Sequence, residues 1–137
     1  MPIAGSIRNK IVARYVDGRQ IKGVTQDFAV GKPEFHVFEG GNEATKAVPV
    51  SVVDLKAVFF VRSYNGDKTH KEYKLFDRAK VQARKILVCF RDGEKLVGFT
   101  LGYNAEKQGF FVTPSDPESN NTRVYVVNRA VREIHWI

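Results

Sequence analysis

The chain has 137 residues, a usual length for a single domain, and it is basic, with 22 Lys and Arg against 15 Asp and Glu. Hydrophobic residues make up 43% of the chain and aromatic residues 12%, which excludes disorder by composition. Cys89 is the only cysteine, so we expect no internal disulfide and no Cys-based zinc cluster. The N-terminus has no hydrophobic signal region, and apolar stretches such as 57–61 are too short to span a bilayer, so we expect a cytoplasmic protein.

The first elements in chain order are the two strands of a hairpin. Apolar residues alternate through Ile11, Ala13 and Tyr15, which is typical of a strand with one buried face. Asp17-Gly18 then predicts a two-residue type I′ turn. The return strand reaches Gly23, and a lone glycine in a strand pattern predicts a bend that curls the sheet.

Three more strands are predicted at 35–38, 47–50 and 55–62, the last preceded by a short turn at 51–54. The following connector, 63–84, is basic, and only its 71–80 segment has room for a helix. From residue 85 the same order returns. A strand that begins near Ile86 leads to a turn at Asp92-Gly93 and a return strand, and three further strands are predicted at 110–113, 123–127 and 131–137.

This return is an internal repeat. Asp17-Gly18 corresponds to Asp92-Gly93 and Gly23 to Gly98, a spacing of 92 − 17 = 75 residues. From the fourth strand on, the spacing is 76, so the second copy carries one extra residue in its 113–123 loop. A repeat of this kind indicates a duplicated supersecondary unit.

We therefore predict an all-β protein of two tandem five-stranded small barrels that pack on each other, each closed or partly open. The predicted domains are a first barrel at 1–62, a basic connector at 63–84 and a second barrel at 85–137. Four glycines are predicted to be structural, at positive φ in the turns or at strand bends: Gly18, Gly93, Gly23 and Gly98.

Each half resembles an Sm-like barrel. Gly18–Gly23 and Gly93–Gly98 match the G-x4-G of the first Sm motif, and 124–131 followed by Ile134 resembles the second. The resemblance implies small-barrel folds, but the Asp-x-x-x-Asn and Arg-Gly signatures of Sm-type RNA sites are missing here, so no uridine pocket is expected. The segment 109–124 also resembles an uncharacterised bacterial protein family to which no activity is attached.

The sequence predicts no enzyme, and therefore no catalytic residues, no metal and no cofactor. His36, His70 and His135 lie far apart, without metal-ligand spacing and without partner cysteines. We interpret them as structural or solvent-facing. The glycines are scattered and form no phosphate-cradling loop.

The basic connector is the one charge signal. Six cations interleaved with Tyr64, Tyr73 and Phe76 are candidates for contacts with a nucleic-acid backbone: Lys68, Lys71, Lys74, Arg78, Lys80 and Arg84. The alternative is a solvated linker whose aromatic residues fill the gap between the barrels. We predict a binding module with a protein-interaction or adaptor role, and nucleic-acid binding through the connector is the second hypothesis. No membrane partner is expected, and the sequence is compatible with a monomer or a homodimer.

The outward face of the second hairpin yields a last expectation. Four apolar residues share this face, where the first hairpin carries a mixed set, so we expect them to be covered: Leu87, Cys89, Val97 and Phe99.

Overall fold

The computed structural model describes residues 9–39, 46–63 and 83–137. The first half, 9–63, contains β1 (Asn9–Tyr15), β2 (Gln20–Thr25), β3 (Glu34–Glu39), β4 (Ala47–Ser51), η1 (Val52–Asp54) and β5 (Leu55–Val61). The second half, 83–137, contains β6 (Arg84–Phe90), β7 (Lys95–Thr100), β8 (Gly109–Pro114), β9 (Asn121–Val127), η2 (Asn128–Ala130) and β10 (Val131–Trp136). The prediction of an all-β protein is confirmed, since the only helices of the described ranges are the single 3-10 turns η1 and η2.

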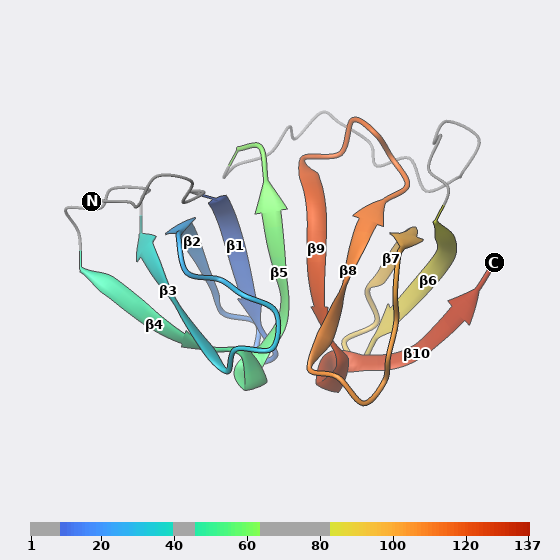
Figure 1. The fold of residues 1–137 in the computed structure, drawn as a ribbon, viewed down its shortest axis with the longest axis horizontal. Helices are drawn as coiled ribbons and strands as arrows, with labels where there is room; N and C mark the ends of the chain where they lie inside the picture. The colour runs from blue at the N-terminus through green and yellow to red at the C-terminus, as the bar shows by residue number, and fades with distance from the viewer. Residues whose placement is uncertain (1–8, 40–45, 64–82) are drawn as a thin grey trace.

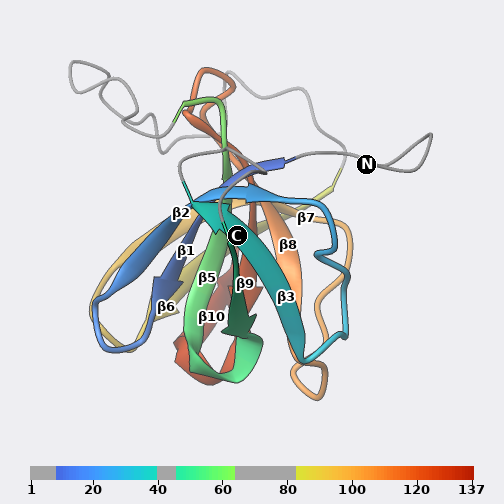
Figure 2. The same cartoon turned by 90° about the vertical axis from the view of Figure 1, so that its left-hand side faces the viewer.

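All ten strands pair antiparallel in one sheet, in the order β10-β6-β7-β8-β9-β5-β1-β2-β3-β4 (Figure 1). Both halves show the same internal pairing, and the hairpin partners Ile11 and Gly23 recur 75 residues later as Ile86 and Gly98. The halves meet where β5, the fifth strand of the first half, pairs with β9, the fourth strand of the second. Seen from the side of the first half, the second half lies behind it (Figure 2).

The prediction of two barrels is not confirmed, because the sheet does not close. In the described chain β4 and β10 are the two outer edges of the ladder, and neither pairs with the fifth or fourth strand of its own half. The physical reason lies at β5, whose edge opposite β1 is occupied by β9 along Ala57–Val61. Each half is a strongly curled part of one open sheet.

Each half curls around its own hydrophobic core. The first core gathers Ile11, Phe35, Val58 and Phe60, and the second gathers Ile86, Val88, Phe110 and Val112. The central strands supply both cores, because successive side chains of a strand point to opposite faces. Their alternate residues divide accordingly: Val58, Phe60, Tyr125 and Val127 face the first core, and Ala57, Phe59, Val124 and Val126 face the second.

An aromatic cluster fixes the two halves against each other. The Phe28 ring packs edge-to-face against Tyr125 at 5.2 Å and Phe111 at 6.3 Å from the second half, and against Phe60 at 5.5 Å from β5. Such edge-to-face pairs stabilise by about 0.5–1.5 kcal/mol each beyond their buried area. The hydroxyl of Tyr125 also donates to Gln108 Oε1 at 3.0 Å, and Gln108 Nε2 donates to the carbonyl of Lys32 at 3.0 Å.

A charged cluster makes a second connection between the halves. Lys56, on β5, has a side chain that is only 7% exposed, and its ammonium donates to Asp92 Oδ2 at 2.6 Å and to Glu94 Oε1. Both carboxylates belong to the β6–β7 turn, and Glu94 also lies 3.7 Å from Arg14. The hydrogen bond from Lys56 lowers the pKa of Asp92 below its ordinary value.

Candidate functional site

Of the six predicted nucleic-acid contacts, only Arg84 belongs to the described chain. Arg84 is the first residue of β6, and its guanidinium carbon lies 3.7 Å from the centre of the Trp136 ring on β10. Lys68, Lys71, Lys74, Arg78 and Lys80 lie outside the described residues.

The four predicted structural glycines fall into two geometries. Gly18 and Gly93 have φ angles of 96° and 95°, the left-handed conformation that favours glycine. The predicted two-residue type I′ turns are wrong, because they require positive φ at Asp17 and Asp92 as well, and no described residue other than glycine has a positive φ. Instead Tyr15 pairs with Arg19, and Phe90 with Glu94, across three-residue loops that end in these glycines. A Cβ on Gly23 or Gly98 would lie 2.2 Å from the carbonyl oxygen of Phe38 or of Thr113 on the neighbouring strand. At these two positions glycine permits the close approach of strands that the curled sheet requires.

The two described histidines each lie beside carboxylates. His36 Nδ1 is 2.7 Å from Asp27 Oδ2, and the other oxygen of Asp27 accepts the backbone N–H of His36 at 2.9 Å. His135 Nε2 is 3.3 Å from Glu133 Oε1. His70 lies outside the described residues. Asp27 thus ties the loop after β2 to the backbone of β3.

The second half carries an apolar groove of about 510 Å³ beside the loop that joins β7 to β8. Its volume is in the range of small-ligand pockets. We call it the apolar groove, and it is lined by Val30, Ala83, Phe99, Leu101, Gly102, Tyr103, Asn104, Lys107, Gly109, Phe110, Phe111, Thr113 and Tyr125.

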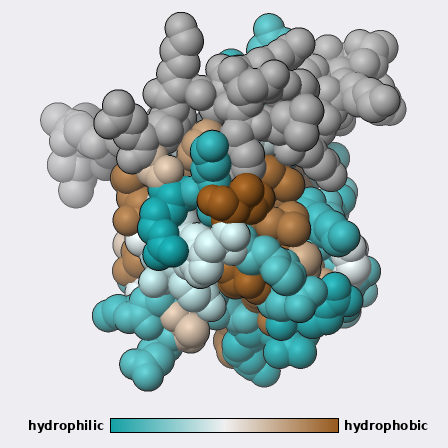
Figure 3. All heavy atoms as spheres, turned by 90° about the vertical axis from the view of Figure 1, so that its right-hand side faces the viewer, coloured by the Kyte–Doolittle hydropathy of each residue, from teal (hydrophilic) through white to brown (hydrophobic). Residues whose placement is uncertain are grey.

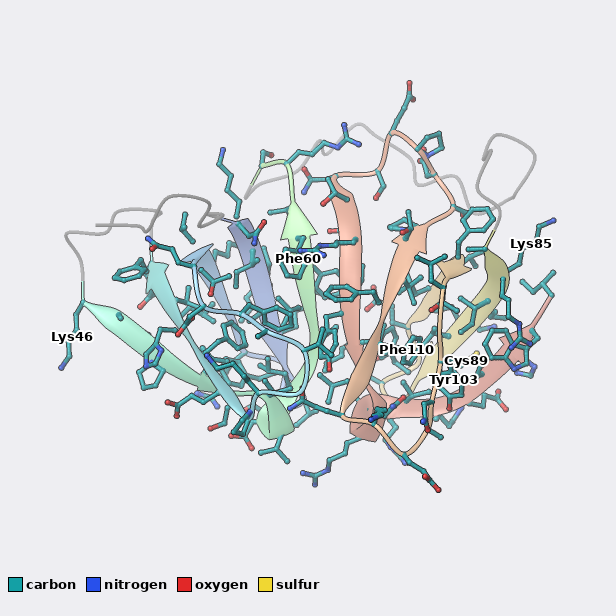
Figure 4. All side chains as sticks on the ribbon, in the orientation of Figure 1. Lys46, Phe60, Lys85, Cys89, Tyr103 and Phe110 are labelled. Atoms are coloured by element: carbon teal, nitrogen blue, oxygen red, sulfur yellow. The ribbon has the colours of Figure 1, made fainter. Side chains whose placement is uncertain are left out.

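Aromatic rings form the base of the apolar groove. Tyr103 packs edge-to-face on Phe110 with ring centres 4.8 Å apart, and Figure 4 labels both side chains. Phe111 packs on the buried Tyr125 at 5.1 Å. Gly109 leaves room for the Tyr125 ring, because a Cβ there would meet that ring at 2.8 Å. Burial raises the pKa of the Tyr125 phenol, which therefore stays neutral.

The rim of the apolar groove exposes large apolar side chains. Leu101 is 93% exposed and Val30 is 62% exposed. Asn128 holds the loop that presents Leu101, because its Nδ2 donates to the carbonyls of Asn104 at 3.1 Å and Lys107 at 2.8 Å. The loop is held in place and exposes Leu101 next to the aromatic rings of the groove. This arrangement is suited to bind an apolar side chain of a ligand.

Near the loop that joins β7 to β8, the two halves differ in one hydrogen bond to the strand backbone. Phe111 corresponds to His36 and Gly102 to Asp27, each 75 residues later. In the first half the Asp27 carboxylate takes the N–H of His36, whereas Gly102 offers no carboxylate to the N–H of Phe111. The Phe111 carbonyl accepts the hydroxyl of Thr100 at 2.8 Å. The β8 backbone at the apolar groove therefore lacks the tether that closes the equivalent place in the first half.

No pattern in the sequence predicts this groove. Its aromatic residues alternate like those of any strand, and the exposure of Leu101 depends on how the 101–108 loop is held. One signal was available in the repeat: Gly102 replaces Asp27 while the flanking Thr25 and Thr100 are the same.

The outward face of the second hairpin meets its expectation in part, since Cys89 and Phe99 are buried and Leu87 and Val97 are half-buried.

Comparison with known proteins gives the chain a family. No curated protein and no solved structure matches it. Among the described residues, no helix is long and apolar enough to cross a membrane. The model of a family of unknown function, DUF6982, matches residues 7–137, which is nearly the whole chain, so the protein belongs to this family.

Proposed function

We propose that this protein is a non-enzymatic binding module, built from a pair of Sm-like units, that acts as an adaptor by holding an extended segment of a partner protein in the apolar groove. The observation that carries the proposal is Leu101, which is 93% exposed on the rim of that groove. Exposed apolar side chains gathered at a concave surface are characteristic of interaction sites.

The backbone supports an extended ligand in particular. An extended segment that lies along β8 would present a carbonyl to the N–H of Phe111, the group that Asp27 satisfies at the equivalent place in the first half. Main-chain bonds of this kind provide affinity in β-strand addition, and pockets for alternate side chains provide specificity. Tyr103 and Phe110 provide such a pocket.

Charge defines the partner further. Lys107 lies on the groove lining, and the whole chain has a net charge of +7. The segment we expect therefore has one or two large apolar or aromatic residues flanked by acidic ones, since complementary charge steers association.

A random peptide library displayed on phage, selected on the wild-type protein, tests the proposal. Selected peptides should contain an apolar anchor and should bind at least about tenfold more weakly to Leu101→Glu. Gly102→Asp should have the same effect by rebuilding the Asp27 tether. This substitution is tolerated sterically, because nothing lies within 4 Å of a Cβ on Gly102. The matched control is Val16→Glu, which changes another exposed apolar residue, 62% exposed, outside the groove.

Two outcomes contradict the proposal: a library that yields no binder, and peptides that bind Gly102→Asp as tightly as wild type.

The second function, nucleic-acid binding through the connector, is tested by titrating the wild-type protein into a fluorescent single-stranded oligonucleotide at low and at physiological salt. Binding that falls steeply with salt and weakens in Arg84→Glu supports it. Binding of the oligonucleotide without selection of any peptide would favour nucleic acid over the protein partner.

A further inference from the structure

Three potential metal ligands lie together on the outer face of β6 and β10. Cys89 Sγ, a carboxylate oxygen of Glu133 and a ring nitrogen of His135 all lie within 4.8 Å of one another. Cys89 is paired with Glu133 in the register of the two strands, and His135 follows two residues later on the same face. Figure 4 labels Cys89 in the second half, where β6 lies beside β10.

A register shift creates this arrangement. Val131 lies opposite Phe90, but Glu133, and not Arg132, lies opposite Cys89, because the ladder shifts between Val131 and Glu133. In a regular ladder Arg132 would occupy the place beside the thiol. The bulge thus exchanges a cation for a carboxylate next to Cys89.

Burial gives the three groups the form of a small cup. Cys89 is 3% exposed, whereas Glu133 and His135 are exposed. The thiol forms the base of the cup and the carboxylate and imidazole form its rim. Figure 3 views the molecule from the side of β10 and β6, where hydrophobic side chains are bordered by polar ones.

The first half has none of these ligands at the equivalent places. Arg14 corresponds to Cys89, Ala57 to Glu133 and Phe59 to His135, and the same register pairs Arg14 with Ala57. Exposure of β10 explains why polar residues replace Ala57 and Phe59. It does not explain a thiol beneath a carboxylate and an imidazole.

We propose that Cys89, Glu133 and His135 bind a Zn²⁺ ion. Thiolate sulfur, imidazole nitrogen and carboxylate oxygen are the three ligand types that zinc takes in proteins, at about 2.0–2.3 Å. Three protein ligands leave the fourth tetrahedral position open to water or to an external ligand. Zinc binding displaces the thiol proton and replaces the contact between His135 and Glu133 by bonds to the metal.

The groups around the triad set a limit on affinity. Arg132 Nη2 lies 3.5 Å from Glu133 Oε1, and Lys95 is paired with Cys89 on the side of β7. Both cations oppose a divalent ion, and Arg132 competes for the same carboxylate oxygen.

Titration of tag-free, EDTA-treated protein with ZnCl2 in a calorimeter tests the site. One equivalent should bind to wild type. Affinity should fall by more than about tenfold in Cys89→Ser and in His135→Gln. His36→Gln is the matched control, because His36 also lies beside two carboxylates, Asp27 and Glu34, but without a thiol. Because His135 and Glu133 are exposed, the His135→Gln and Glu133→Gln variants will fold even if Cys89→Ser does not.

Co²⁺ in place of Zn²⁺ makes the test specific for the thiolate. Wild type and His36→Gln should show a thiolate-to-cobalt charge-transfer absorbance, which Cys89→Ser should lack, and Zn²⁺ should slow the reaction of Cys89 with a thiol reagent. Failure of wild type to take up Zn²⁺ would overturn the proposal. So would cobalt binding without the thiolate band, or equal affinity in wild type and His135→Gln.

Discussion

The two fifth strands occupy the same place in their halves but have opposite surroundings. β5 carries Ala57 and Phe59 on the face that packs against the second core. β10 carries Glu133 and His135 at the equivalent positions, both exposed. The difference shows that a neighbouring half covers β5, whereas no described element covers the same face of β10.

The two fourth strands differ in the same sense. Tyr125 on β9 is paired with Val58 across the junction between the halves. Its counterpart on the edge strand β4 is Pro49, which is paired with His36. The His36 N–H bonds Asp27 instead of β4, so the backbone of Pro49 faces outward, where its missing N–H removes a donor from the free edge.

Together the two comparisons indicate where the ladder ends. The strands that meet at the junction, β5 and β9, carry residues suited to pairing and burial. The strands left at the edges, β4 and β10, carry a proline and charged side chains, which are common means of blocking edge-to-edge association. The fourth and fifth strands of the repeat are therefore each adapted to pairing at the junction in one half and to a free edge in the other.

Tyr125→Pro should have the largest effect on stability, since it places in β9, at the junction between the halves, the proline that β4 carries on its free edge. It removes a backbone donor and a buried aromatic ring, and we expect a loss of at least about 3 kcal/mol in the free energy of unfolding. Urea denaturation measures this loss. Tyr125→Phe, which removes only the hydrogen bond to Gln108, should lose about 1 kcal/mol. Equal, small losses in both variants would contradict the role of the junction.

Lys56→Met tests the charged connection between the halves, with Arg132→Met as the equivalent change in the second half. We expect a loss of about 1 kcal/mol for Lys56→Met, because Asp92 and Glu94 stay half-exposed and solvated once the lysine is gone. Arg132 is exposed, and its loss should cost less than about 0.5 kcal/mol.

The Lys56 connection also has a defined pH dependence. The pKa of Asp92 is lowered in the folded state, so its contribution is present above the ordinary Asp pKa and is lost as the pH falls through the folded pKa. The stability difference between wild type and Lys56→Met should therefore be constant near neutral pH and shrink in acid. A difference that grows in acid would contradict this sign.

Pro49→Thr should have the smallest effect on stability, within about 0.5 kcal/mol, because Pro49 is exposed on an edge strand. Its expected consequence is association, since threonine restores the donor of the free edge. Sedimentation velocity should show a larger self-associated fraction than in wild type at the same protein concentration. An unchanged distribution would show that proline does not protect this edge.

Local chemistry made the hairpins predictable from sequence. Gly18 and Gly93 supply the positive φ of the turns, and Gly23 and Gly98 allow strands to approach, so the glycines marked the positions of the turns and bends. The type of turn was not predicted correctly, because Asp17 and Asp92 do not take the positive φ of a type I′ turn. The open sheet was not predictable in this way, because pairing β5 with β9 is a choice between partners that are far apart in sequence. One trace of that choice exists: 55–61 is a nearly continuous apolar run, whereas 131–136 is interrupted by Arg132, Glu133 and His135.

The candidate sites were less predictable than the fold. The apolar groove depends on a loop held by Asn128, and the zinc ligands meet only through a bulge that shifts Glu133 opposite Cys89. Neither arrangement follows from the spacing of residues in the chain. Comparing the two copies position by position would have identified Gly102 against Asp27, since that exchange removes a hydrogen-bonding group.

Hydrogen exchange of the backbone amides tests the central claim, that β5 and β9 join the two halves into one sheet whose outer strands are edges. The amides of β5 and β9 should exchange in the slowest class together with β1, through global unfolding, because these strands are paired on both sides. The amides of β4 and β10 should exchange faster. Exchange of β5 and β9 at the rate of β4 would contradict the account.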